Sequence, residues 1–174
     1  MKKYPNILIV RGTGRNVGKT VSACKIIEKL ANENAPIGIK ISAHFHELEN
    51  PEFVCQSEEF EIIEEKGRSN KDSSRMLQAG AEKVFYIQSE NRISAKAFGA
   101  LLNQIDTLKP IIVESGGLYD FVEPGILVHI FGENGKNTTE IRPETNVVKV
   151  FSEEVKDFNW DFLQFKNGKF VGYA

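Results

Sequence analysis

Short apolar runs alternate along this chain with longer segments in which apolar residues recur at helical spacing. The short runs predict buried strands over 6–10, 37–41, 83–88, 110–114, 126–131 and 147–151. The longer segments predict amphipathic helices over 19–34, 72–81 and 94–105. Because strands that alternate with helices form βαβ units, we expect an α/β fold. A mostly parallel sheet would be the middle layer of a three-layer α/β/α sandwich.

Two segments fall outside this alternation. Between Glu47 and Glu65 the chain carries eight Glu and no Lys or Arg. The pieces FVCQS and FEIIEE within it fit either a strand pair or a loop with one extended piece. We expect the whole segment to be a solvated, mobile or partner-facing flap. Near the end of the chain, Asn167-Gly168 stands between aromatic-rich runs and predicts a C-terminal β-hairpin with a type I′ turn.

Composition narrows the class of protein. The chain has 174 residues, 41% of them hydrophobic and 26% charged, which fits one globular domain over 1–174 and excludes disorder and disulfide scaffolds. The formal net charge of -2 argues against a dedicated nucleic-acid binder. Cys24 and Cys55 lie far apart, outside any metal-ligand spacing, which predicts reduced thiols in a cytoplasmic protein. The apolar run that follows MKKYPN is too short for a signal peptide or a membrane span.

The stretch GTGRNVGKT directly follows the first predicted strand and opens the first predicted helix. It consists of Gly12, Thr13, Gly14, Arg15, Asn16, Val17, Gly18, Lys19 and Thr20. Glycines let a loop turn its backbone N–H groups inward around phosphates, and a helix N-terminus attracts negative charge. We expect Lys19 to reach the β- and γ-phosphates of a nucleoside triphosphate and the Thr20 hydroxyl to bind Mg²⁺. The first glycine of the strict pattern G-x-x-x-x-G-K-[ST] would fall on Thr13, so this loop is one residue longer when counted from Gly12.

A phosphate loop also needs a carboxylate on a neighbouring strand, which holds the metal or polarises water. Glu114 ends the apolar run PIIVE and precedes Ser-Gly-Gly, so we assign it both a catalytic and a metal-binding role. Asp72 is a second candidate metal ligand, although an acid at the start of a predicted helix can equally serve as a cap. Lys40 lies at the end of the second predicted strand and is a candidate catalytic residue, with Lys19, for contact with phosphate or an acidic substrate. A solvated surface position is the alternative for Lys40.

His44 and His46 lie two residues apart, as in HxH metal pairs, and share one face of an extended segment. No third His or Cys ligand stands near them in the sequence, which disfavours a metal site. Contact with a substrate and simple surface exposure are the stronger interpretations.

Three motifs carry a resemblance to known families. The loop over 12–20, together with VESGGL over 113–118, is similar to the dethiobiotin synthetase and MinD-like branch of P-loop NTPases. Dethiobiotin synthetases have the same extra loop residue, a lysine after the second strand and an acid–glycine–glycine strand end. The segments IKISAHFH over 39–46 and NKDSSRMLQAGAEKVF over 70–85 resemble the molybdopterin-guanine dinucleotide biosynthesis protein B family more closely.

The resemblance implies a P-loop NTPase fold and a function. It implies a protein that binds GTP or ATP with Mg²⁺ and assists the enzyme of molybdenum-cofactor assembly that attaches GMP to molybdopterin. Such a protein would be a weak or partner-stimulated NTPase, and homodimers are common among similar proteins. The positions that match the motifs are Lys19, Thr20, Lys40, Asp72 and Glu114. The chain departs from the patterns at Gly14, Val21 and Asn70.

Two other functions remain open from the sequence. One is an ATP-dependent ligase of the dethiobiotin synthetase type, although such ligases have longer chains than these 174 residues. The other is a nucleotide-binding module without hydrolysis. The choice between ATP and GTP is also open, because no NKxD motif marks a guanine site. Asn134 and Asn137, in the unmatched region after Gly132, are candidates for contact with the base.

Overall fold

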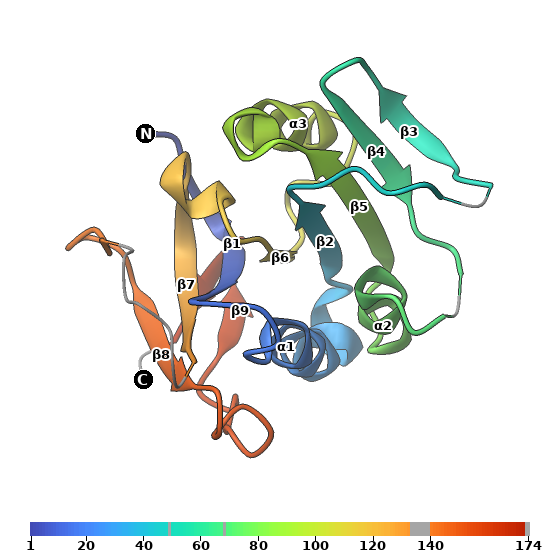
Figure 1. Cartoon of the computed structure of the whole chain (residues 1–174). Coiled ribbons are helices and arrows are strands. Elements are labelled where there is room, and N and C mark those ends of the chain that lie inside the picture. Colours follow the sequence, from blue (N-terminus) through green and yellow to red (C-terminus); the bar gives the residue numbers. More distant parts are fainter. Residues whose placement is uncertain (49, 68, 133–139, 173–174) are drawn as a thin grey trace.

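A computed structural model of the chain describes residues 1–48, 50–67, 69–132 and 140–172 (Figure 1). Its main sheet contains eight strands: β1 (Lys3–Gly12), β2 (Ile37–Ser42), β3 (Phe53–Gln56), β4 (Phe60–Glu64), β5 (Lys83–Ser89), β6 (Ile111–Glu114), β7 (Glu123–Phe131) and β8 (Val147–Phe151). The helices are α1 (Lys19–Asn34), α2 (Asp72–Gln78) and α3 (Ser94–Leu102), with single 3₁₀ turns η1 (Asn91–Ile93) and η2 (Leu118–Asp120). A small separate sheet pairs β9 (Gln164–Lys166) with β10 (Lys169–Val171).

The strand order places the carboxyl ends of several strands side by side. It runs β3-β4-β5-β2-β6-β1-β7-β8, and the successive strands from β5 to β8 in this order are parallel to one another. At the β3 edge, the pairs β3–β4 and β4–β5 are antiparallel, so β4 runs against the direction of the other strands described in this sheet. The predicted α/β class with a mostly parallel sheet is therefore confirmed. In such sheets ligands bind beyond the carboxyl ends of the strands, near crossovers in strand order.

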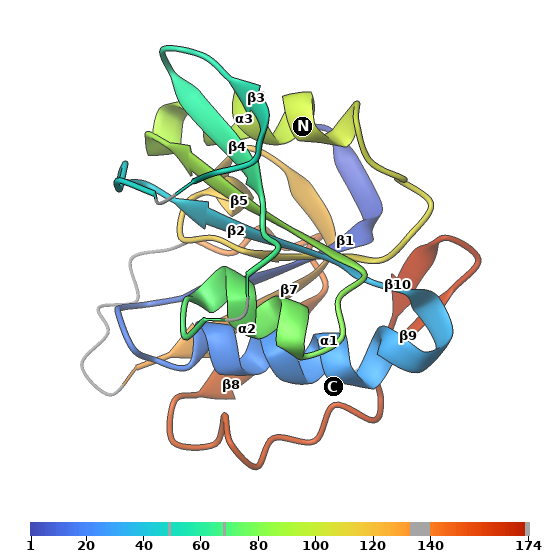
Figure 2. The same cartoon turned by 90° about the vertical axis from the view of Figure 1, so that its right-hand side faces the viewer.

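Both faces of the sheet are covered (Figure 2). Helices α1 and α2 and the C-terminal segment pack on one face, where Trp160, Leu163 and Phe170 join the core. Helix α3 packs on the other face over β4 and β5. The central strands are apolar on both sides because both of these layers exclude water from them. No helix in the described ranges is long and apolar enough to cross a membrane.

The C-terminal hairpin forms as the sequence predicted. Strands β9 and β10 are antiparallel, and Lys166 pairs with Lys169 across a two-residue turn. Asn167 and Gly168 have φ values of 52° and 73°. Positive φ at both central positions is what a type I′ turn requires.

The pieces FVCQS and FEIIEE form the strand pair β3–β4, one of the two predicted alternatives, so this part of the acidic segment is not the expected flap. Strand β4 lies inside the sheet, between β3 and β5, and buries Phe60 and Ile62. Several glutamates are neutralised by lysines elsewhere in the chain: Glu52 by Lys66, Glu59 by Lys96 and Glu64 by Lys83. The flap was predicted from the charges within residues 47–65 alone. The lysines that pair with these glutamates lie outside that range.

Two helices end earlier than their apolar spacing predicted. Helix α2 stops at Gln78 because Gly80, with φ of +100°, turns the chain in the left-handed region. The N–H groups of Gly80 and Ala81 then donate to the carbonyls of Leu77 and Met76, which is the Schellman pattern of a helix end. Helix α3 stops at Leu102, three residues before the predicted end.

Candidate functional site

The loop between β1 and α1 is held in one shape by contacts with two distant segments. Thr13 donates its backbone N–H to the carbonyl of Ile130 over 3.0 Å, and its hydroxyl accepts the N–H of Gly132 over 2.9 Å. Gly18 has φ of +100°, and a Cβ there would lie 2.8 Å from Val155 Cγ1. The start of the loop is therefore hydrogen-bonded to the end of β7, and its last glycine packs against Val155 of the C-terminal segment.

Lys19 is the first residue of α1, and its side chain turns back over the loop. Its Nζ donates to the carbonyl of Gly14 over 2.5 Å. Burial lowers the pKa of Lys19 below its usual value, an effect that the nearby charge of Glu114 offsets only in part. The ammonium is thus held against the loop backbone, at the wall of the cavity described below.

Glu114 lies at the carboxyl end of β6, between β1 and β2, and is only 1% exposed. Its two oxygens have different partners: the Thr20 hydroxyl donates to Oε2 over 2.9 Å, and Lys40 Nζ donates to Oε1 over 2.5 Å. Lys40 stands directly opposite Glu114 in the register of β2 and β6. A buried carboxylate is costly unless it is paired in this way.

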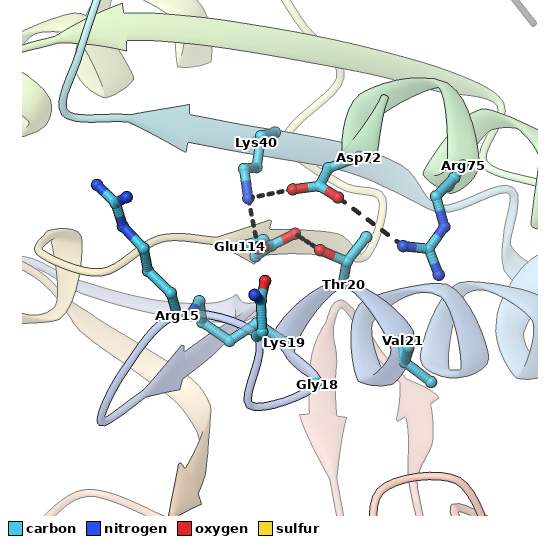
Figure 3. Close-up of a pocket in the computed structure, with 10 residues that line it drawn as sticks. Arg15, Gly18, Lys19, Thr20, Val21, Lys40, Asp72, Arg75 and Glu114 are labelled. Atoms are coloured by element: carbon cyan, nitrogen blue, oxygen red, sulfur yellow. Dashed lines mark hydrogen bonds and ion pairs between the residues drawn. The ribbon is translucent and has the colours of Figure 1, made fainter. Parts of the chain in front are cut away.

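Lys40 bridges Glu114 to Asp72, as Figure 3 shows. Its Nζ lies 2.9 Å from Asp72 Oδ2. Burial on its own lowers the pKa of Lys40, but the charge and hydrogen bond of Glu114, helped by Asp72, outweigh it and raise the pKa above its usual value. Burial on its own raises the pKa of Asp72, but the hydrogen bond and charge of Lys40 outweigh it and hold that pKa below its usual value. Asp72 makes no side-chain cap of α2, whose N-cap residue is Lys71.

These side chains surround one cavity of about 440 Å³ (Figure 3). Its lining is Arg15, Asn16, Gly18, Lys19, Thr20, Val21, Lys40, Asp72, Arg75 and Glu114. Four of the lining side chains are basic and two are acidic, so the cavity favours an anion.

Arg75 is a lining residue that the sequence analysis missed. It lies one helical turn after Asp72, and its Nη1 is 3.9 Å from Asp72 Oδ1. The signal was present in the DSSR spacing, because residues three apart share a helix face. The spacing points to Arg75 as a site residue only when it is already known that Asp72 lines the cavity.

Four of the proposed phosphate-loop residues shape the loop without lining the cavity. They are Gly12, Thr13, Gly14 and Val17. Val17 is buried beneath the loop, and a Cβ on Gly12 would lie 2.5 Å from its Cγ2. The glycine at position 12 therefore permits a close approach that a larger residue would prevent.

The residues proposed for magnesium fit that ion in part. Mg²⁺ takes oxygen ligands in octahedral geometry and keeps several waters. The oxygens of Thr20 and Glu114 lie together on the cavity wall, whereas Asp72 is joined to them through the Lys40 ammonium. Within the described residues, no group of three or more His, Cys, Asp or Glu could hold a metal. Phosphate and water oxygens would have to supply the remaining ligands.

The other candidate residues lie away from this cavity. His44 is exposed and does not line it, and His46 contributes to a neighbouring cavity. Asn134 and Asn137 fall outside the described residues.

Comparisons with known proteins do not assign the chain to a family. A scan of protein-family models, a search of curated proteins and a search of solved structures each found no match to the chain.

Proposed function

We propose that the chain binds a nucleoside triphosphate with Mg²⁺ at the loop over 12–20. One observation carries the proposal: a GKT-ended loop joins a central parallel strand to a helix, and it opens onto a cavity with an excess of basic side chains. Backbone N–H groups at a helix N-terminus and the Lys19 ammonium are suited to the charge of β- and γ-phosphates. The expected P-loop NTPase fold is part of the same proposal.

Each residue of the site then has a distinct task. Lys19 and the loop backbone neutralise the phosphate oxygens, and Arg15 and Arg75 add positive charge from opposite walls. Thr20 and Glu114 would hold Mg²⁺, which supplies charge neutralisation between the β- and γ-phosphates when bound. Lys40 donates to Glu114 and holds its carboxylate in place at the strand end.

Slow hydrolysis fits this arrangement better than fast turnover. Each oxygen of Glu114 already accepts one hydrogen bond, from Thr20 or from Lys40, and Mg²⁺ would take up further acceptor capacity, which leaves little for a proton from water. We therefore propose a weak NTPase that a protein partner stimulates. The motifs over 39–46 and 70–85 support an accessory role in molybdenum-cofactor assembly, with GTP or ATP as the nucleotide.

Thermal unfolding with and without nucleotide tests the proposal. A ligand present at one hundred times its Kd stabilises the folded state by about 2.7 kcal/mol, which raises Tm by about 5–10 °C in a domain of this size. We expect Mg-ATP or Mg-GTP to produce such a shift in the wild type and none in Lys19→Ala. Lys29→Ala is the matched control, because Lys29 lies on the same helix but outside the cavity. A full shift in Lys19→Ala would remove the loop from the function.

A further inference from the structure

A second cavity of about 460 Å³ adjoins the first, and the two share Lys40 and Asp72 in their walls. Its floor is continuous with the floor of the phosphate site. Ile63, Tyr86, Lys40 and Glu114 occupy successive register positions across β4, β5, β2 and β6. A row of side chains thus runs from Ile63 in the second cavity to the buried carboxylate of the first.

A buried side chain, that of Gln88, holds the outer wall of the second cavity in place. Gln88 is fully buried in β5, yet it reaches the loop that follows β2. Its Oε1 accepts the N–H of His46 over 2.6 Å, and its Nε2 donates to the His46 carbonyl over 3.2 Å and to Glu61 over 3.0 Å. Two bonds to one residue's backbone hold the loop in place, so His46 and Leu48 form a defined wall.

The charges of this cavity differ from those of the phosphate site. The described residues of its lining include three carboxylates and two ammonium groups, and one ammonium, Lys40, is already paired with Asp72 and Glu114. Glu65 is half-buried and fixed, because it accepts hydrogen bonds from Ser73 over 2.6 Å and from the Gly67 N–H over 2.8 Å. Lys71 is exposed and can move into solvent. The fixed charge of the cavity is therefore negative.

We infer that the second cavity binds a small molecule with an apolar or aromatic body and a positively charged amine. The body would rest on Tyr86 and Ile63, and the amine would face Glu65. A cavity of about 460 Å³ is within the size range of small-molecule sites, and Leu48, Ile63 and the Tyr86 ring give it apolar surface among its polar groups. That this molecule would lie beside the terminal phosphate of a nucleotide rests on the proposed function. That the second cavity binds an amine does not depend on nucleotide binding.

Three matched probes test this inference by ¹⁹F NMR titration: 4-fluorobenzylamine, 4-fluorobenzyl alcohol and 4-fluorobenzoate. We expect the wild type to bind the amine about tenfold more tightly than the benzoate, with the alcohol between them, because a charge-assisted hydrogen bond is strong. Glu65→Gln keeps an acceptor for Ser73 but removes the charge, so it should abolish the preference for the amine. Ser42→Phe, which places a ring in the second cavity, should weaken all three probes.

Glu64→Gln is the matched control, because Glu64 is the adjacent acid and lies outside the second cavity. It should leave all three affinities unchanged. Absence of binding, equal affinity for amine and benzoate, or an unaltered preference in Glu65→Gln would overturn the inference. Thermal shifts with Mg-ATP and Mg-GTP in the same samples separate the two proposals. Amine binding without a nucleotide shift refutes only the proposed function, and a nucleotide shift without amine binding refutes only the second site.

Discussion

Lys40→Met removes the cation that neutralises the buried Glu114. In the wild type the ammonium lies 2.5 Å from Glu114 Oε1, and the carboxylate side chain is 2% exposed. Methionine fills similar space but offers neither charge nor a donor. The variant therefore leaves the buried Glu114 carboxylate without its cation and with the hydrogen bond from the Thr20 hydroxyl.

The expected loss in the free energy of unfolding is about 3 kcal/mol. Breaking a buried ion pair by removing one partner costs about 3–5 kcal/mol. The low end applies here, because Thr20 still donates to Glu114 and the cavity gives water access to the site. A loss of that size lowers Tm by about 6–12 °C in a domain of this length.

Urea unfolding at neutral pH measures this loss, and a double-mutant cycle assigns its cause. Glu114→Gln in the Lys40→Met background removes the uncompensated charge, so we expect the double variant to recover to within about 1 kcal/mol of the wild type. A single-variant loss below about 1 kcal/mol would contradict the reasoning. Additive losses in the cycle would show that the two side chains act independently.

Three further results follow from the site. Gly18→Ala should lose more than about 1 kcal/mol of stability in urea unfolding, because φ is +100° and the new Cβ would meet Val155; wild-type stability would contradict the packing. Asp72→Asn should be less stable than the wild type at neutral pH, but this difference should vanish in acid. The pKa of Asp72 is held below 3.8, so its contribution is present above that value and is lost as the pH falls through the lower folded value. Because the pKa of Lys40 is raised above its usual value of 10.5, the difference should stay constant between about pH 5 and 9; a difference that does not decline as the pH falls below 3.8 would refute the pairing. Glu114→Gln should reduce hydrolysis or its Mg²⁺ dependence more than nucleotide affinity, as measured by phosphate release and by titration, and unchanged hydrolysis would exclude Glu114 from the reaction.

The sequence predicted the strand, loop and helix that begin the site because the signals there are local. A β-branched run, three glycines and an amphipathic helix follow one another within residues 6–34. It also predicted that Glu114 and Lys40 end strands, and the carboxyl ends of parallel strands meet at one edge of a sheet. Their direct opposition in β2 and β6 depends on strand order, which local pattern does not encode.

The parts of the site that depend on distant contacts could not be predicted. Val155 supports Gly18 from a segment more than a hundred residues away, and nothing in its local sequence marks that role. Strand β4 of the acidic segment is part of the sheet because it buries Phe60 and Ile62, while lysines from elsewhere pair with glutamates of the segment at the surface. Gln88 looked like the end of a strand, although its side chain holds the wall of the second cavity.

Calorimetric titration of the wild-type chain with non-hydrolysable analogues of ATP and GTP tests nucleotide binding most directly. We expect one site per chain, tighter binding in Mg²⁺ than in excess chelator, and no binding to Lys19→Ala under the same conditions. Absence of binding by both analogues, or equal affinity in the wild type and Lys19→Ala, would contradict the assignment of the loop over 12–20 as a triphosphate site.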